Sequence, residues 1–392
     1  MRHALHLAWA YLAHQRFKTA VLVASVALIA FLPAALQLLV RRGEERMGAR
    51  AASTPLLVGR KGSPTELVLN ALYFRSGVPE TIPYAQVARV EQSGRAQAIP
   101  LHVRFRSQDA PIVGTSLDYF ALRGLRVQQG RLMTRLGQCV VGSAVAATRG
   151  LQVGDGVLSS PEQVFDLAGS YPLRMRVSGI LAPSGTADDR AVFVDVKTAW
   201  VIQGLAHGHD DVSKPEAAAA VLSRKDGRIV ANASVREYQE ITAENADGFH
   251  FHGDPDTFPL SAIIAVPHDD RAATLLLGEF QAPDEAEQIL RPRDVVDELL
   301  DTVFAVKRYI VAGIVIVALG TLATMALVFG LSIQLRRREI ETMRKIGGAR
   351  RRIGAVLALE ILSVLALGLV LAGILLALTG LWADTLVESA IR

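Results

Sequence analysis

Three long apolar runs limit what this chain can fold into. They cover Thr19–Val40, Tyr309–Ile333 and Ile353–Gly380, and each is long enough to cross the hydrocarbon core of a bilayer as one helix. Residues 41–308 lie between the first two runs, which is enough chain for a folded domain with its own core. We therefore expect a membrane protein with α-helical spans and a large extracytoplasmic α+β domain inserted between the first and second span.

Composition agrees with a protein that is partly in the membrane. Apolar residues make up 51% of the chain, which is high for a soluble protein and low for one that is all membrane. Cys139 is the only cysteine, so no intramolecular disulfide supports the domain, and we expect a buried, inert thiol. The net charge of +4 does not indicate a nucleic-acid partner, because no stretch interleaves basic with aromatic residues.

The distribution of charge sets the orientation of the chain. Residues 334–352, between the second and third apolar runs, are dense in arginine and lysine and contain few acids. Such loops stay in the cytoplasm. This loop outweighs the arginines that follow the first run, so we expect the N-terminus inside and residues 41–308 outside. The tail, residues 381–392, is then also expected outside.

Helices are predicted on either side of the spans. Residues 1–18 place Leu5, Trp9 and Leu12 on one helical face, as in an amphipathic helix in the membrane interface. The alternative is a signal-peptide n-region, but the apolar run that follows is long for a signal peptide, so we favour an uncleaved span. The residues at about 41–52 and 292–308 are expected to continue the first two spans as stalk helices.

Short strand patterns occur in the domain. Leu101–Phe105 and Leu173–Val177 alternate apolar and polar residues, and Val192–Val194 is a short apolar run. Turn signals such as Gly154-Asp155-Gly156 separate these segments. The mixture of such strands with helical patterns predicts an α+β fold.

The cytoplasmic loop has a helical pattern of its own. Ile340, Met343 and Ile346 fall at helical spacing, and Gly347 supplies a stop. One interpretation is an anchor bound to lipid headgroups. The other is a docking helix for a cytoplasmic partner, with these three side chains as its apolar stripe.

The loop sequence RRREIETMRKIGGARRRI resembles the cytoplasmic loop of FtsX-like ABC transporter permeases, the group that includes the MacB and LolC/LolE types. Residues 138–155 and 178–195 are similar to parts of the MacB-type periplasmic core domain. In that family the loop docks onto a separate ATPase. The resemblance implies this role for Arg337, Arg338, Glu339, Ile340, Met343, Arg344, Ile346 and Gly347.

The resemblance also implies a place in a complex. The chain would be a multi-pass permease subunit in a bacterial inner membrane, with its large domain in the periplasm. It would pair as a homodimer or with a related permease, bind two copies of a cytoplasmic ABC ATPase, and meet a periplasmic binding or adaptor protein. Members of the family usually carry a fourth span, whereas this sequence shows three.

Motifs for catalysis are absent from the sequence. It contains no P-loop, no G-x-S-x-G and no H-E-x-x-H. We therefore expect no enzyme activity and no directly bound cofactor, with ATP and Mg²⁺ held by the partner ATPase. The resemblance to FtsX-like permeases implies that the outer domain is moved by mechanotransmission.

Histidines beside acids form one unusual region. In an extended segment His250 and His252 share one face, and Phe249 and Phe251 share the other. Two imidazoles with carboxylates nearby suit Zn²⁺. A solvated acidic surface loop is the alternative. The candidate ligands are His207, His209, His250, His252, Asp254 and His268.

Glu360 is an acid inside the third apolar run. Acids in spans are candidates for function. We favour the alternative, in which Glu360 reaches back towards Arg351 or Arg352, or faces a neighbouring helix.

Several functions remain compatible with the sequence. One is a metal-linked transport system, and another is efflux of lipoproteins, lipids or drugs. A third is a non-transport regulator of a cell-wall enzyme, and a fourth is a membrane-anchored receptor without an ATPase.

Overall fold

The structure is a computed structural model. It describes residues 2–75, 77, 79–160, 172–208, 221–225, 228–231, 238–242, 244–282, 284–335, 337–345 and 350–390. The chain divides into two compact units. One consists of Met1–Met47 with Glu298–Arg392, and the other is Gly48–Asp297.

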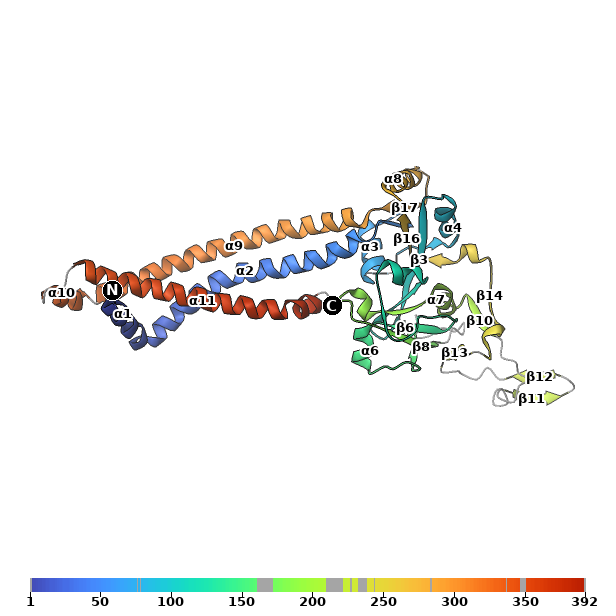
Figure 1. The fold of residues 1–392 in the computed structure, drawn as a ribbon, viewed down its shortest axis with the longest axis horizontal. Coiled ribbons are helices and arrows are strands. Elements are labelled where there is room, and N and C mark those ends of the chain that lie inside the picture. The colour runs from blue at the N-terminus through green and yellow to red at the C-terminus, as the bar shows by residue number, and fades with distance from the viewer. Residues whose placement is uncertain are drawn as a thin grey trace. The chain divides into compact units, whose positions relative to one another are not determined.

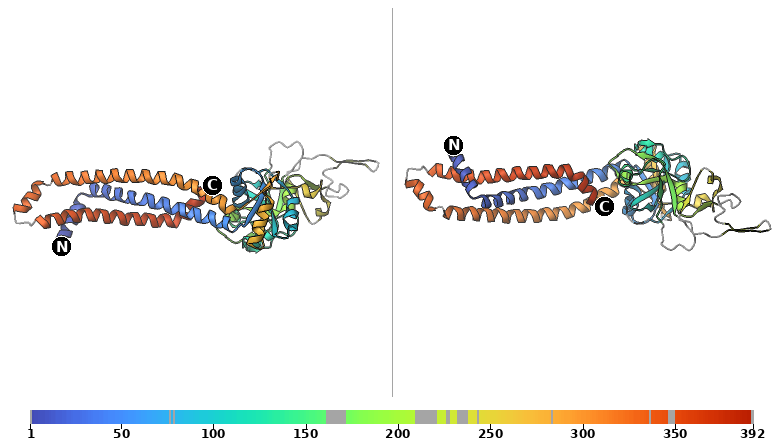
Figure 2. Two further views of the ribbon diagram at one scale, coloured as in Figure 1. Left: turned by 90° about the horizontal axis from the view of Figure 1, so that it is seen from above. Right: turned by 90° about the horizontal axis from the view of Figure 1, so that it is seen from below.

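The first unit is helical. Its helices are α1 (Arg2–His14), α10 (Arg337–Lys345), α11 (Arg350–Ala390) and most of α2 (Arg16–Ala52) and α9 (Pro292–Leu335). In the described part of the chain, three segments are long and apolar enough to cross a membrane: Arg16–Ala52, Tyr309–Leu335 and Gly354–Trp382. Figure 1 and Figure 2 show α2, α9 and α11 running side by side.

A stripe of residues four apart joins α11 to its neighbours. Val364 is fully buried, and it packs with Leu12 of α1 and with Leu22 and Val26 of α2. At Gly368 an added Cβ would lie 2.6 Å from the Cβ of Val26. Small residues allow helices in a membrane to approach this closely. The contact between α2 and α11 therefore depends on a position that has no side chain.

The second unit contains an 11-stranded mixed sheet. The strand order is β13-β8-β6-β9-β4-β3-β16-β1-β17, with β5 and β7 also paired to β8. The pairs β4–β9, β6–β8 and β13–β8 are parallel. The strands are β1 (Leu56–Arg60), β3 (Ala96–Ser107), β4 (Ala110–Thr115), β5 (Val127–Gly130), β6 (Gln138–Val141), β7 (Gly156–Leu158), β8 (Leu173–Leu181), β9 (Val192–Asp195), β13 (Gln239–Glu240), β16 (Ala262–Pro267) and β17 (Glu287–Leu290).

Short strands and helices surround this sheet. Two-stranded ladders pair β2 (Ile82–Pro83) with β15 (Pro259–Leu260), β10 (Ala206–Gly208) with β14 (Phe249–Phe251), and β11 (Val221–Lys225) with β12 (Arg228–Ala231). The helices are α3 (Pro64–Tyr73), α4 (Ala85–Gln92), α5 (Asp118–Leu122), α6 (Ser143–Arg149), α7 (Val196–Ile202) and α8 (Asp270–Glu279), with short 3₁₀ turns η1 (Ala187–Arg190), η3 (Ala246–Gly248) and η4 (Pro255–Thr257).

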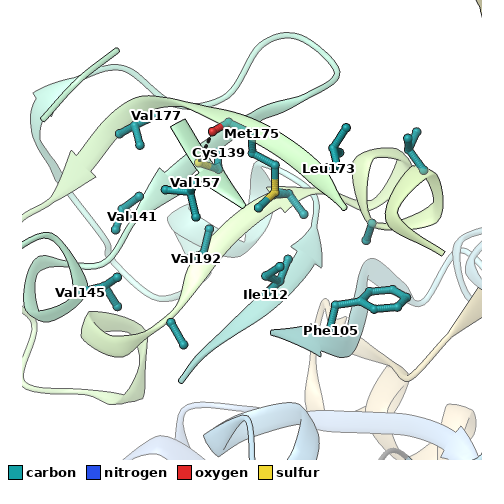
Figure 3. Packing of buried hydrophobic residues seen from close by; sticks show 14 of the residues in the cluster. Phe105, Ile112, Cys139, Val141, Val145, Val157, Leu173, Met175, Val177 and Val192 are labelled. Carbon is teal, nitrogen blue, oxygen red and sulfur yellow. Dashed lines mark hydrogen bonds between the residues drawn. The ribbon is translucent and has the colours of Figure 1, made fainter. Parts of the chain in front are cut away.

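Two apolar clusters in the described part of this unit contribute to its core. The one in Figure 3 joins β3, β4, β6, β8 and β9, and it contains Cys139 and Met175. Burial raises the pKa of the Cys139 thiol to about 12, so this side chain is an inert part of the core, as expected. The other cluster packs α4, α7 and α8 against β1 and β16 and includes Trp200 and Phe258.

The three strands predicted from the sequence are confirmed as parts of β3, β8 and β9. His102, a polar residue of the alternating pattern in β3, is fully buried. Its Nε2 lies 3.0 Å from the Gln203 side-chain oxygen, at the C-terminal end of α7. Burial lowers the pKa of His102 to about 4. This histidine is therefore a neutral member of the core.

We predict that Gly368→Val weakens the helical unit, because the new side chain would overlap Val26. Overpacking of this kind destabilises by about 1–3 kcal/mol. Gly373→Val is the matched control, since a Cβ at Gly373 meets nothing within 4 Å and the change in helix propensity is the same. The measurement is the midpoint of unfolding in SDS mixed micelles by circular dichroism. Equal midpoints for the two variants would contradict the packing described here.

Candidate functional site

The expected docking segment forms a separate helix. In α10, Arg337 lies 3.6 Å from Glu341 in an i, i+4 ion pair, and both side chains are exposed. Ile340 is half-buried. Glu339, Met343 and Arg344 belong to the same helix, but their side chains are not described, and Ile346 and Gly347 lie outside the described residues. Helical spacing nonetheless places positions 340 and 343 on one face of α10.

The histidine pair lies on β14 and just after it. His250 and His252 are exposed, and their ring centroids are 4.6 Å apart. Phe249 and Phe251 are half-buried and pack against the apolar core, so the predicted division of faces is confirmed. The ladder register places His207 of β10 opposite His250.

The other candidate metal ligands are placed separately. Asp254 caps η4 by accepting a hydrogen bond from the backbone of Asp256. His268 follows β16, and its backbone N–H donates to Arg95. His209 lies outside the described residues, as does the neighbouring segment 210–220. Within the part of the chain that the structure describes, no three metal-ligating side chains gather into a group that could hold a metal ion.

Glu360 lies on the buried stripe of α11. Its side chain is 4% exposed, one turn before Val364 and two turns before Gly368. Glu360 thus lies on the face of α11 that packs against other helices.

A buried ionic cluster at the end of α2 was not predicted from the sequence. Arg50, in the last turn of α2, binds Asp188 of η1 through two hydrogen bonds of 2.6 and 2.9 Å. The two side chains are 6% and 1% exposed. Tyr119 of α5 donates to Asp188 at 2.7 Å and accepts from Arg50 at 2.8 Å. Three elements that are distant in the sequence therefore meet at one buried charge pair.

The remaining polar atoms of this pair are also satisfied. The Arg50 Nε donates to the carbonyl of Leu72 at the end of α3, and Thr186 donates to Asp188 at 2.8 Å. The Arg50 guanidinium lies 5.5 Å from the ring centroid of Phe74. A fully hydrogen-bonded pair of this kind is rigid, whereas a half-satisfied one would be strongly destabilising.

Close packing fixes the segment that carries Asp188. A Cβ at Gly142 would lie 2.3 Å from the backbone oxygen of Asp188, so β6 and η1 approach too closely for any side chain at 142. Phe74 adopts a left-handed backbone conformation, φ 57°, that is unusual for a bulky residue. Its ring packs edge-on to Phe193 of β9. The sheet, α3 and η1 together hold the cluster in place.

The charge of Asp188 depends on Arg50. Burial alone raises the pKa of a carboxyl group, but the charge and hydrogen bonds of Arg50 outweigh it and hold the pKa of Asp188 below its usual value. The only sequence signals for this site were an arginine after an apolar run and the acidic turn Asp188-Asp189. Neither signal predicts the pairing, because the two residues are 138 positions apart.

The fold and the charged elements define a class of protein. An α+β domain lies between helices that are apolar enough to span a membrane, and a basic helix lies between the last two of them. The profile of the MacB-like periplasmic core domain matches residues 20–236, more than half of the chain, and that of the FtsX-like permease C-terminal region matches residues 311–392. The chain belongs to this FtsX-like, MacB-type permease family.

Membership has a general consequence for function. The chain is the permease subunit of an ABC transporter, an inner-membrane protein with a periplasmic domain, and it associates with a cytoplasmic ABC ATPase.

Two solved structures show a low similarity to the chain. The periplasmic region of MacB from Actinobacillus actinomycetemcomitans is 12% identical, with a TM-score of 0.33, over 63% of this chain and 92% of that one. The extracellular domain of the ABC-type transporter YknZ from Gram-positive bacteria is 13% identical, with a TM-score of 0.33, over 60% and 98%. A comparison with curated proteins finds no match.

We predict that Arg50→Met destabilises the domain by about 3–5 kcal/mol at pH 7, because it leaves the Asp188 charge buried without a partner. The loss should shrink as the pH falls towards 4. In the wild type the pair stabilises the fold above the unfolded pKa of Asp188, and that contribution is lost as the pH falls through the lower folded pKa. In the variant, burial without Arg50 raises the pKa of Asp188, so protonation relieves the penalty.

The measurement is urea unfolding of the intact chain in detergent, followed by fluorescence of the buried Trp200 after Trp9 and Trp382 are changed to Phe. Arg89→Met is the control, because the Arg89–Glu285 pair is partly exposed, at 38% and 15%, and should contribute about 1 kcal/mol or less. A loss for Arg50→Met that does not depend on pH would contradict the electrostatic account.

Proposed function

We propose that this permease subunit couples ATP hydrolysis by a separate cytoplasmic ATPase to motion of its periplasmic domain. In the proposed topology α2, the apolar part of α9, and α11 cross the inner membrane, and residues 41–308 lie in the periplasm. The single observation that carries the proposal is α10, an exposed basic helix between two segments suited to spanning, in a chain of this family.

The helix α10 has the features of a docking element. Arg337 and Arg338 are exposed, while Ile340 is half-buried on the opposite side from Thr342. An amphipathic helix of this kind binds a partner by laying its apolar face into a groove. The basic residues around it keep the helix on the cytoplasmic side, where the ATPase is.

The permease is proposed to act as a pair with two ATPase copies. Within the described chain, no residue in the most apolar window of Tyr309–Leu335 is buried. A shallow groove between α2 and α9 is lined partly by the small residues Ser25, Gly313, Ala318 and Thr321. Small residues let helices of two chains pack closely in a membrane, so this face suits a second permease, identical or related.

We predict that Ile340→Asp abolishes co-purification of the ATPase from membranes, because a charge on the apolar face of α10 cannot be buried in a partner. Thr342→Asp is the matched control. It adds the same charge to the same helix at an exposed position, and it should retain the ATPase. Both variants should insert in the membrane at normal levels. Retention of the ATPase by both would show that α10 is not the docking element.

A metal-linked transport system is a second proposal for the cargo. It is supported by the close, outward-facing rings of His250 and His252 and by the register that places His207 opposite His250. Imidazole nitrogens are good ligands for Zn²⁺. The site would be a sensing or acceptor site on the domain surface, and zinc could also be presented by a periplasmic partner protein.

We predict that the detergent-solubilised chain, purified without a histidine tag, binds Zn²⁺ with micromolar affinity in calorimetry. The double variant His250→Ala/His252→Ala should weaken Zn²⁺ binding at least about tenfold, because both imidazole ligands are lost. His268→Ala should change it little if the site is on β14. If the wild type releases no heat on addition of Zn²⁺, the metal-linked proposal is wrong. The candidate functions are then efflux of lipoproteins, lipids or drugs, or regulation of a cell-wall enzyme.

A further inference from the structure

The end of α2 is held to the domain by more than a chain connection. The helix is continuous from Arg16 to Ala52, and Arg50 lies ten residues beyond Val40, about 15 Å along the helix axis. At that point the guanidinium enters the domain core and contacts α3, α5 and η1 through hydrogen bonds. Arg123, next to α5, adds a bond of 3.2 Å to Ser53, which follows α2 directly.

The geometry points to Arg50 as the residue that transmits movement of α2 to the body of the domain. This inference rests on the proposed ATP-driven motion. Displacement of α2 would pull on Asp188, and therefore on η1, which is joined to β9 through the single residue Ala191. It would also act on Gly142 at the end of β6, which contacts the backbone of Asp188. Arg50 is in this sense a positioning residue, and it contacts no substrate.

The Arg50–Asp188 pair can transmit movement because it is buried. Opening it would expose two charges to an apolar surrounding of Phe74, Tyr119 and Phe193, where an unpaired charge is strongly disfavoured. The bidentate geometry also fixes direction, because the planar fork of arginine matches the two carboxylate oxygens in one orientation. Sliding or rotation of α2 therefore moves Asp188 with it.

The test is hydrogen exchange on the complex of the full chain with its co-purified ATPase in nanodiscs, with and without Mg-ATP and vanadate. In the wild type, nucleotide should change exchange both in residues 43–52 and in residues 186–191. In Arg50→Met the change should persist in 43–52 and disappear in 186–191. A purely structural role would raise exchange in the variant but would leave its response to nucleotide intact.

Two further variants keep the test decisive. Arg50→Lys keeps a positive charge beside Asp188 and is expected to fold, but it cannot reproduce the bidentate fork, so the response of 186–191 should be reduced. Arg89→Met removes a bidentate pair elsewhere in the domain and should leave both responses unchanged. A normal response of 186–191 in both Arg50 variants would overturn the inference.

Different results would contradict the proposed ATP-driven motion and the coupling of α2 to the domain through Arg50. If no ATPase co-purifies, or if nucleotide changes neither segment in the wild type, the proposed ATP-driven motion is wrong and the inference falls with it. If 43–52 responds in the wild type but 186–191 does not, α2 moves without the domain, and the inference alone is wrong.

Discussion

A carboxylate that is 1% exposed requires a cation, and in this domain the cation comes from the last turn of α2. Burying Asp188 without Arg50 would cost several kcal/mol, so the end of α2 contributes strongly to the stability of the folded domain. The chain then enters β1 at Leu56, next to β16 and β17. The same requirement explains the packing nearby, because η1 must approach β6 so closely that position 142 has no side chain. The end of α2 is thus part of the domain core.

The helical unit follows a different physical rule. Lipid is as apolar as leucine, so helices in it associate through close packing and polar contacts. The α11 stripe packs closely against α2 at Gly368, and Glu360 is buried on the same face. The apolar part of α9 has no such burial within the described chain. Either lipid or another chain must cover it, and its small residues suit another helix.

The periodicity of the sequence predicted the helices and strands better than it predicted the tertiary contacts of their side chains. Apolar runs gave three candidate membrane helices, period-two patterns gave β3 and β8, and a short apolar run gave β9, because these signals are local. The same local pattern placed His250 and His252 on one face correctly. It did not show that α7 buries His102 of β3, since alternation along one strand contains no information about a helix that comes much later in the sequence. The Arg50–Asp188 pair lay beyond sequence reasoning for the same reason.

Exposure separates the ionic contacts that can transmit motion from those that cannot. The pair Arg337–Glu341 is 82% and 54% exposed, and the Arg89–Glu285 pair is 38% and 15% exposed. Water can replace either partner in such pairs, so they open at little cost. At Arg50 and Asp188, with 6% and 1% exposure, water cannot do this without unfolding the segments around it. A domain driven through its connecting helix would therefore be coupled at the pair whose opening is most unfavourable, which is the pair in the last turn of α2.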